Sequence, residues 1–220
     1  MNCKHCGSQC VKQGFQKDGT QKYLCKGCSK YQQETYRYKA YEKAVNTNII
    51  KQVNRGSGIR DIAYILEISA STVIRRIRYI ASLIEPPLYT CKFQEYEMDE
   101  MYTNVWLENR KTPIYVSYAI NKATGESIGF TIGSRDSKTL QKVVGKMLLN
   151  YPRQIRTDKW SGYSSIIPRH IHITNKYKIN KIERNHLTMR MQLKRLSRVS
   201  LCQSKKLDML EACLKIYFWG

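Results

Sequence analysis

The sequence lacks the features of membrane-spanning and exported proteins. No apolar run approaches the roughly 20 residues that a membrane-spanning helix requires. The start Met1-Asn2-Cys3 leaves no room for a secretory signal. We therefore expect a cytoplasmic protein, in which the eight cysteines are reduced or bound to metal rather than paired in disulfides.

Acidic residues are also scarce. Asp and Glu number 17 against 38 Lys and Arg, and the formal net charge is +21. The excess runs through both halves, with 15 basic and 6 acidic residues up to Thr90 and 23 and 11 after it. Such a chain is expected to bind a polyanion along its whole length, and double-stranded DNA is favoured over an anionic membrane surface.

Two cysteine pairs near the amino terminus have the spacing of a zinc site. They are Cys3 with Cys6 and Cys25 with Cys28, separated by eighteen residues. Four thiolates satisfy tetrahedral Zn²⁺ and leave no open coordination position, so a structural zinc is expected. Residues 11–15 and 21–24 are predicted strands joined by an Asp-Gly turn, which together indicate a zinc ribbon. The tyrosine-rich and basic stretch 31–43 is either a linker or a nucleic-acid contact.

A helix-turn-helix is predicted after this stretch. Apolar residues recur at helical spacing in 59–66 and in 70–80, and a short turn separates the two segments. The second helix of such a motif enters the major groove of DNA, although an ordinary helical hairpin is the alternative. Candidate contacts to bases or phosphates are Ser71, Thr72, Arg75, Arg76 and Arg78. Glu85-Pro86-Pro87 ends this region, so we expect a ribbon and linker over 1–42 and a DNA-binding domain over 43–87.

The pattern changes to that of strands beyond the prolines. Three strands are expected at about 94–107, 114–121 and 127–132, followed by a helix that Ser137 can cap. A fourth strand ends at Asp158, another lies at 171–173, and a basic amphipathic helix spans about 181–197. This order predicts an α/β domain of the ribonuclease-H-like type with a mixed sheet, over residues 88–220.

Glu183 is the only acidic residue between positions 169 and 206, a stretch with eleven Lys and Arg. A divalent cation would explain a carboxylate on a surface that suits phosphate, because such a metal brings oxygen ligands and phosphate together. A helical ion pair with Arg184 or Arg190 is the alternative. Arg190 and Lys194 stand seven and eleven residues after Glu183, so on one continuous helix the three share a face where both cations can bind phosphate.

Two further acids are candidate ligands of the same cation. In the expected fold Asp99 lies inside the first strand and Asp158 at the end of the fourth, which pairs beside the first. The two carboxylates are therefore expected to meet, and acids at strand ends with one on a later helix suit a two-metal phosphoryl-transfer site. Glu97, two residues before Asp99 on the same strand face, is the main rival for the first ligand.

The chain resembles the transposases of the insertion-sequence-one type, bacterial enzymes of the Asp-Asp-Glu class. The matching segments are 158–163 (DKWSGY), 182–190 (IERNHLTMR) and 193–198 (LKRLSR). The cysteine pairs and the predicted helix-turn-helix also look like that family's amino-terminal region, so the resemblance covers nearly the whole chain. It implies a triad that binds Mg²⁺ or Mn²⁺, together with a basic residue two turns after the glutamate. The implied catalytic residues are Asp99, Asp158, Glu183 and Arg190.

The expected activity is metal-assisted in-line attack on DNA, first by water and then by the exposed 3′-hydroxyl on target DNA. Two cations about 3.5 to 4 Å apart would serve both steps. A homo-oligomer on DNA is expected because two element ends must be held together, in a bacterial, nucleoid-associated protein. The alternatives are a zinc-ribbon and helix-turn-helix transcription regulator without catalysis, and a ribonuclease-H-like nuclease such as a junction resolvase.

Overall fold

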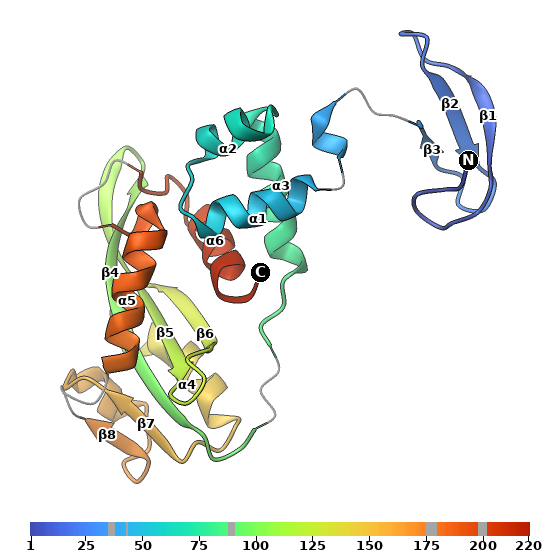
Figure 1. Ribbon diagram of the computed structural model, residues 1–220. Coiled ribbons are helices and arrows are strands. Elements are labelled where there is room, and N and C mark those ends of the chain that lie inside the picture. The colour runs from blue at the N-terminus through green and yellow to red at the C-terminus, as the bar shows by residue number, and fades with distance from the viewer. Residues whose placement is uncertain (35–37, 43, 88–90, 175–179, 198–201) are drawn as a thin grey trace.

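The computed structural model describes residues 1–34, 38–42, 44–87, 91–174, 180–197 and 202–220. Along the chain they form a small antiparallel sheet, a group of helices, and a mixed five-stranded sheet with helices on its faces (Figure 1). The predicted domain boundaries at residues 43 and 88, and part of the tyrosine-rich stretch, lie outside the described ranges.

The small sheet has the order β1-β2-β3. The predicted hairpin is confirmed, with β1 at Cys10–Phe15 and β2 at Gln21–Cys25. Gly19 has a φ of 80° in the turn between them, which glycine adopts without steric cost. A third strand, β3 at Tyr31–Gln32, was not predicted. Two residues are too few to show the alternation by which a strand is found in a sequence.

Three helices follow the short 3-10 helix η1 (Lys39–Tyr41). They are α1 (Val45–Asn54), α2 (Ile59–Leu66) and α3 (Ala70–Leu83). Glu67 ends α2 in the left-handed region, and the Ser69 side chain caps α3 by accepting a hydrogen bond from Thr72 N at 3.2 Å. The two helices of the predicted helix-turn-helix share a core, in which Ile62 and Val73 are fully buried and pack with Ile77.

The large sheet has the order β6-β5-β4-β7-β8. Its strands are β4 (Glu95–Leu107), β5 (Arg110–Asn121), β6 (Ser127–Gly133), β7 (Gln154–Thr157) and β8 (His172–Thr174). The first three are antiparallel, whereas β7 runs parallel to both β4 and β8. The prediction that the fourth strand pairs beside the first is confirmed, and the mixed sheet is consistent with a ribonuclease-H-like domain.

Two boundaries in this region were predicted wrongly. β5 begins at Arg110 rather than Ile114, because Glu108 and Asn109 form a tight turn with φ of 49° and 59°. The cap of α4 (Ser137–Leu148) is Asp136 and not Ser137, because the Asp136 side chain accepts the hydrogen bond from Thr139 N at 2.7 Å.

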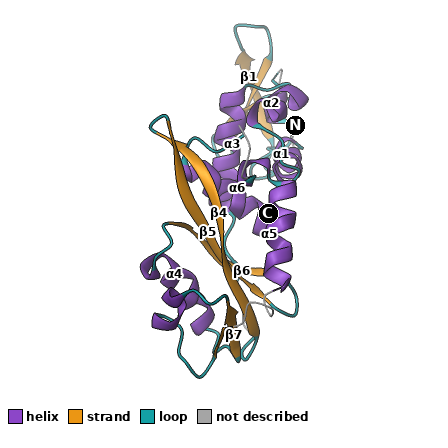
Figure 2. Cartoon of the chain, turned by 90° about the vertical axis from the view of Figure 1, so that its left-hand side faces the viewer, coloured by secondary structure: helices purple, strands orange, loops and turns teal. Residues whose placement is uncertain are grey.

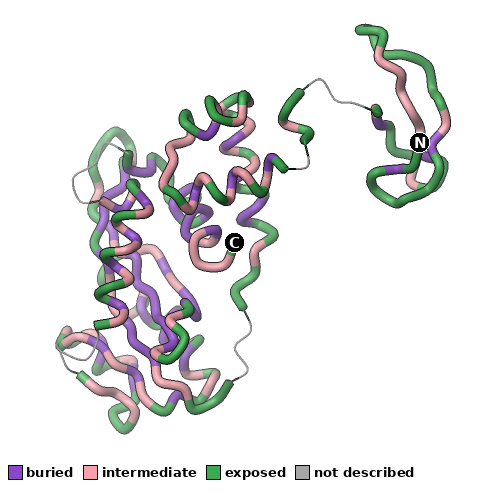
Figure 3. The backbone as a smooth tube through the Cα atoms, viewed as in Figure 1, coloured by how far each residue is buried: buried purple, intermediate pink, exposed green. Residues whose placement is uncertain are grey.

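Helices cover both faces of the large sheet (Figure 2). On one face α4 buries its apolar side against Tyr96 and Met98 of β4 and Ile155 of β7. On the other face lie α5 (Asn180–Gln192) and α6 (Leu207–Trp219), which pack on the middle of β4 and β5. The buried residues form two separate cores, one on each face of the sheet. Figure 3 shows that buried residues follow the strands of this sheet.

The carboxyl-terminal helix α6 was not predicted from the sequence. Leu210 and Leu214 on α6 belong to the core of the large sheet. Cys213 and Ile216 belong instead to the core of α1, α2 and α3. α6 therefore packs against both the helices α1 to α3 and the large sheet. The domain boundary expected at residue 88, between these two regions, stays a prediction.

The predicted helix over 181–197 was too long. α5 ends at Gln192, and the chain continues through Leu193 into the 3-10 helix η3 (Lys194–Leu196). Leu193 and Leu196 are fully buried in the core of the large sheet, and the change of helical geometry allows both to point there. Lys194 therefore does not continue the α-helical face of Glu183 and Arg190.

Candidate active site

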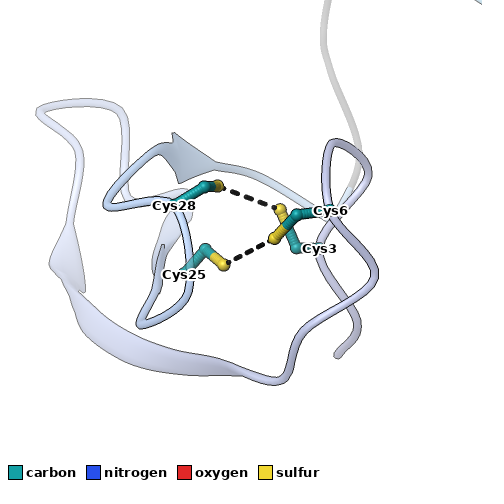
Figure 4. Close-up of side chains that lie close together, drawn as sticks. All are labelled: Cys3, Cys6, Cys25 and Cys28. Atoms are coloured by element: carbon teal, nitrogen blue, oxygen red, sulfur yellow. Dashed lines mark hydrogen bonds between the residues drawn. The ribbon is translucent and has the colours of Figure 1, made fainter.

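The four amino-terminal cysteines lie together around one point (Figure 4). Sulfur atoms of Cys3 and Cys28 are 3.6 Å apart, and those of Cys6 and Cys25 are 3.4 Å apart. Tetrahedral zinc with Zn–S bonds of about 2.3 Å places its sulfurs about 3.8 Å apart, so the group fits one such ion. The backbone N–H of His5 donates to Cys3 Sγ and lowers the pKa of Cys3 to about 6, which favours the thiolate that binds metal.

Asp99 and Asp158 meet as predicted. The parallel pairing of β4 with β7 places Glu97 opposite Arg156, and two residues further along each strand stand the two acids. Their carboxylates form a group with that of Glu100 in which one oxygen from each lies within 4.8 Å of the others. Oxygens on opposite sides of a Mg²⁺ ion lie about 4.2 Å apart, so these three carboxylates fit a divalent cation with little movement.

Glu183 lies in the first turn of α5 and is exposed. It is outside the group formed by the other three acids, but its charge contributes to raising the pKa of Asp99. Arg190 lies two turns later on α5, where its charge adds to the effect of burial in lowering the pKa of His186. Lys194 is exposed in η3. Asp99 and Asp158 therefore lie close together, and Glu183 lies on the neighbouring helix α5.

Glu97, the predicted rival for the first ligand, is buried and has another partner. Its Oε2 accepts a hydrogen bond from the backbone N–H of Ile182 at 3.0 Å, in the first turn of α5. First-turn N–H groups of a helix lack intrahelical acceptors, so this carboxylate satisfies one of them. Glu97 therefore fixes the start of the helix that carries Glu183.

The environment of Asp99 disfavours its charged form when no metal is bound. Burial, and then the neighbouring charges of Glu100, Asp158 and Glu183, raise the pKa of Asp99 to about 7. Burial also raises the pKa of Glu100. Like charges close together in a buried site have this effect, and a bound cation would reverse it.

His186 on α5 stands beside Asp99, with Nδ1 at 3.7 Å from Oδ2. Burial, with a smaller contribution from Arg190, lowers the pKa of His186 to about 4. The imidazole is therefore neutral at pH 7, and the contact is not an ion pair there.

Arg135, Tyr163 and Glu100 belong to this site but were not predicted. Arg135 Nη2 lies 3.2 Å from Asp158 Oδ2 and 3.5 Å from Glu100 Oε2. Its guanidinium stacks on Trp160, 4.8 Å from the ring centroid. The charge of Glu100 contributes to raising the pKa of the buried Tyr163 phenol. The only available signal was the adjacency of Glu100 to Asp99.

The predicted DNA contacts on α3 differ in their surroundings. Ser71 and Arg75 are exposed, and Arg75 pairs with no carboxylate of the described residues. Thr72 hydrogen-bonds through its hydroxyl to Ser69. Arg76 Nη2 donates to the backbone carbonyl of Ala40 at 3.0 Å, and Arg78 pairs with Asp208 of α6 at 2.8 Å. No helix within the described ranges has the length and apolar character needed to cross a bilayer.

Comparison with known proteins decides the family. Residues 93–218, which include both sheet faces and all three predicted acids, match the family described as IS1 transposase. The chain belongs to the IS1 transposase family. It is 30% identical over 115 residues to the insertion element iso-IS1n protein InsB of Shigella dysenteriae, covering 52% of this chain and 86% of that protein. It is 27% identical over 121 residues to the IS1 protein InsB of Shigella flexneri, covering 55% and 91%.

This IS1-family chain is therefore a transposase of an insertion element. A solved structure, the simian T-cell lymphotropic virus intasome in complex with PP2A regulatory subunit B56 gamma, gives a TM-score of 0.31 at 13% identity. It is matched over 63% of this chain and 56% of that chain. At this TM-score the likeness supports no statement about shared architecture.

Proposed function

We propose that this transposase is a divalent-metal-dependent enzyme of the Asp-Asp-Glu class that cleaves DNA at the element's ends and joins them to target DNA. The observation that supports this most strongly is the meeting of Asp99 and Asp158 on adjacent parallel strands, with Glu183 on the helix beside them. Carboxylates in this arrangement suit Mg²⁺ or Mn²⁺ bound against a phosphodiester.

Different residues of the chain bind the cation and the phosphate. Asp99, inside β4, and Asp158, directly after β7, hold the cation, and Glu183 approaches the same point from α5. Arg190, two turns later on α5, binds the phosphate whose oxygens gain charge during in-line attack. A divalent cation supplies Lewis-acid stabilisation of the attacking and leaving oxygens.

The amino-terminal half supplies DNA binding in this proposal. The four cysteines bind a structural Zn²⁺ in a zinc ribbon, and α2 with α3 form a helix-turn-helix that recognises the terminal repeats. On α3 the exposed Ser71 and Arg75 are best placed to contact DNA. Thr72, Arg76 and Arg78, together with Lys194 of η3, are the further contacts. The protein works as a homo-oligomer, since two element ends must be cut and joined together.

The test uses purified protein, labelled element ends and target DNA with Mg²⁺. Asp158→Asn is expected to abolish cleavage and strand transfer, a loss of at least about 10³-fold, while end binding in a mobility-shift assay is retained. Cleavage by the variant at the wild-type rate would disprove the assignment. Binding without any magnesium-dependent nicking by the wild type would indicate a regulator, and nicking without a strand-transfer product would indicate a nuclease.

A further inference from the structure

Glu100 is a buried carboxylate that neither the triad nor the fold requires. Its side chain is 1% exposed, and its neighbours are the Arg135 guanidinium, with Nη2 at 3.5 Å from Oε2, and the Tyr163 phenol. Glu97, three residues earlier on β4, is equally buried but accepts its hydrogen bond from Ile182 N. A buried carboxylate is costly unless it is paired with a cation, so the position of Glu100 requires positive charge beside it.

A cation from the chain itself already stands beside it. Arg135 Nη2 bridges Glu100 and Asp158 at 3.5 and 3.2 Å and forms an ion pair with each. The place between these two carboxylates is thus one where positive charge is stabilised. The Arg135 side chain remains 34% exposed, so it can leave this place without first unpacking a core.

Glu100 also meets the geometric requirement for a ligand. One of its oxygens lies within 4.8 Å of an oxygen of Asp99 and of Asp158, whereas Glu97 belongs to no such group among the described residues. Alternation along a strand sends the side chains of residues 99 and 100 to opposite faces. At this point of β4, both carboxylates nevertheless come close to the one that follows β7.

We propose that Glu100 is a ligand of the catalytic cation together with Asp99 and Asp158, and that Arg135 neutralises this site until the cation displaces it. The proposal rests on the proposed metal-dependent function and adds a fourth acid to it. Arg135 is in this view a competitor of the metal. A role in structure alone would make its removal lower metal affinity, whereas competition makes its removal raise it.

The test measures Mn²⁺ binding to the full, zinc-loaded chain without DNA, by electron paramagnetic resonance of the free ion. Glu100→Gln is expected to weaken binding at least about tenfold, in the range seen when groups around a metal site are lost. The matched control is Glu97→Gln, which keeps an acceptor for Ile182 N and is expected to leave the affinity within about twofold of wild type.

Arg135→Gln provides a second variant with the opposite expected sign. It should tighten Mn²⁺ binding by about tenfold, because an opposing cation next to the ligands is removed. Lys159→Gln is its control, since it removes an exposed positive charge next to Asp158 that pairs with no carboxylate of the described residues. Any tightening common to both variants reflects general electrostatics.

The possible outcomes separate this inference from the function on which it rests. If Asp99→Asn and Asp158→Asn bind Mn²⁺ as wild type does, the metal-dependent function itself is wrong. If those two lose binding while Glu100→Gln retains wild-type affinity, only the role of Glu100 is disproved. Should circular dichroism show that Glu100→Gln is unfolded, Arg135→Gln decides, and tightening no greater than in Lys159→Gln overturns the proposal.

Discussion

Asp99 lies in an environment that disfavours its charged form, and a bound metal ion would remove this penalty. Its side chain is 16% exposed and lies among three other carboxylates, and its pKa is raised to about 7 from a usual value of 3.8. Between these two values the folded chain binds a proton that the unfolded chain releases. The free energy of unfolding of the metal-free protein therefore falls as pH rises from about 4 to about 7, and the loss is complete above that range.

Asp99→Asn is accordingly expected to stabilise the metal-free protein at pH 8. The gain should be about 1 to 3 kcal/mol, because the variant removes a buried charge that three like charges repel. Urea denaturation at pH 8 and at pH 4.5 measures it, and the gain should vanish at the lower pH. Asp61→Asn, at an exposed position on α2, is the control and should give no gain at either pH. Equal stability of Asp99→Asn and wild type at pH 8 would contradict the raised pKa of Asp99.

The sequence predicted part of this site for a clear reason. Asp99 and Asp158 were found because parallel pairing of the first and fourth strands brings equivalent positions together, and that pairing follows from the order of elements. Glu100 and Arg135 were not found. The alternation rule assigned Glu100 to the far face, and the contact of Arg135 with the acids depends on the path of the loop between β6 and α4, which no periodicity encodes.

At the scale of elements, the end of α5 is fixed by a close backbone contact. A Cβ added to Gly56, between α1 and α2, would lie 2.1 Å from the carbonyl oxygen of Gln192, the last residue of α5. Gly56 also has a φ of 74°, which side chains rarely adopt. The first loop of the helical region and the end of the helix bearing Glu183 are therefore packed backbone to backbone.

Gly56→Ala is expected to destabilise the protein by more than about 2 kcal/mol. Left-handed strain alone costs about 1 to 2 kcal/mol, and the clash with a carbonyl adds to it because neither backbone can move freely. The control is Gly125→Ala, whose φ of 83° is similar but whose added Cβ would meet only the flexible end of Lys181. Thermal denaturation compares the two, and an equal loss would show that the contact with Gln192 contributes nothing.

The missed helix α6 shows why some elements escape sequence patterns. A surface helix is recognised by one apolar stripe, but α6 buries Leu210 and Leu214 on the large sheet and Cys213 and Ile216 on α1 and α3. Because both faces of α6 are apolar, its sequence lacks the single apolar stripe by which a surface helix is recognised. The helix α4 has a single apolar stripe, and its existence and approximate start were predicted from that pattern.

At the scale of the molecule, we expect α6 to make the helical region and the large sheet one cooperative unit, because it contributes residues to both cores. Leu210→Ala removes a side chain from the sheet core and Ile216→Ala one from the helical core, each at an expected cost of about 2 to 5 kcal/mol. Either change should lower the midpoint temperature of a single melting transition that circular dichroism and calorimetry both detect. Two transitions, of which each variant moves only one, would show that the regions unfold independently.

The first 34 residues should behave as a separate unit whose stability comes from zinc. Their buried cluster consists of Cys3, Cys10 and Cys25, with Tyr23 and Cys28 packed against it, and among the described residues it includes none beyond position 28. So small a core supplies little hydrophobic stabilisation, and binding of Zn²⁺ by thiolates is then nearly all of the folding free energy. The rest of the chain has its own cores and does not depend on the metal.

Removing zinc with a chelator is therefore expected to unfold the small sheet and leave the remainder folded. Hydrogen exchange followed by mass spectrometry should show loss of protection in β1 and β2 with unchanged protection in β4 and β5. Cys25→Ser should give the same pattern without a chelator, because it removes the fully buried ligand. Cys91→Ser, an exposed cysteine outside the group, should change neither. Protection of β1 that survives both the chelator and the Cys25 variant would mean that the sheet is held by its own packing, and a structural role for zinc would then be excluded.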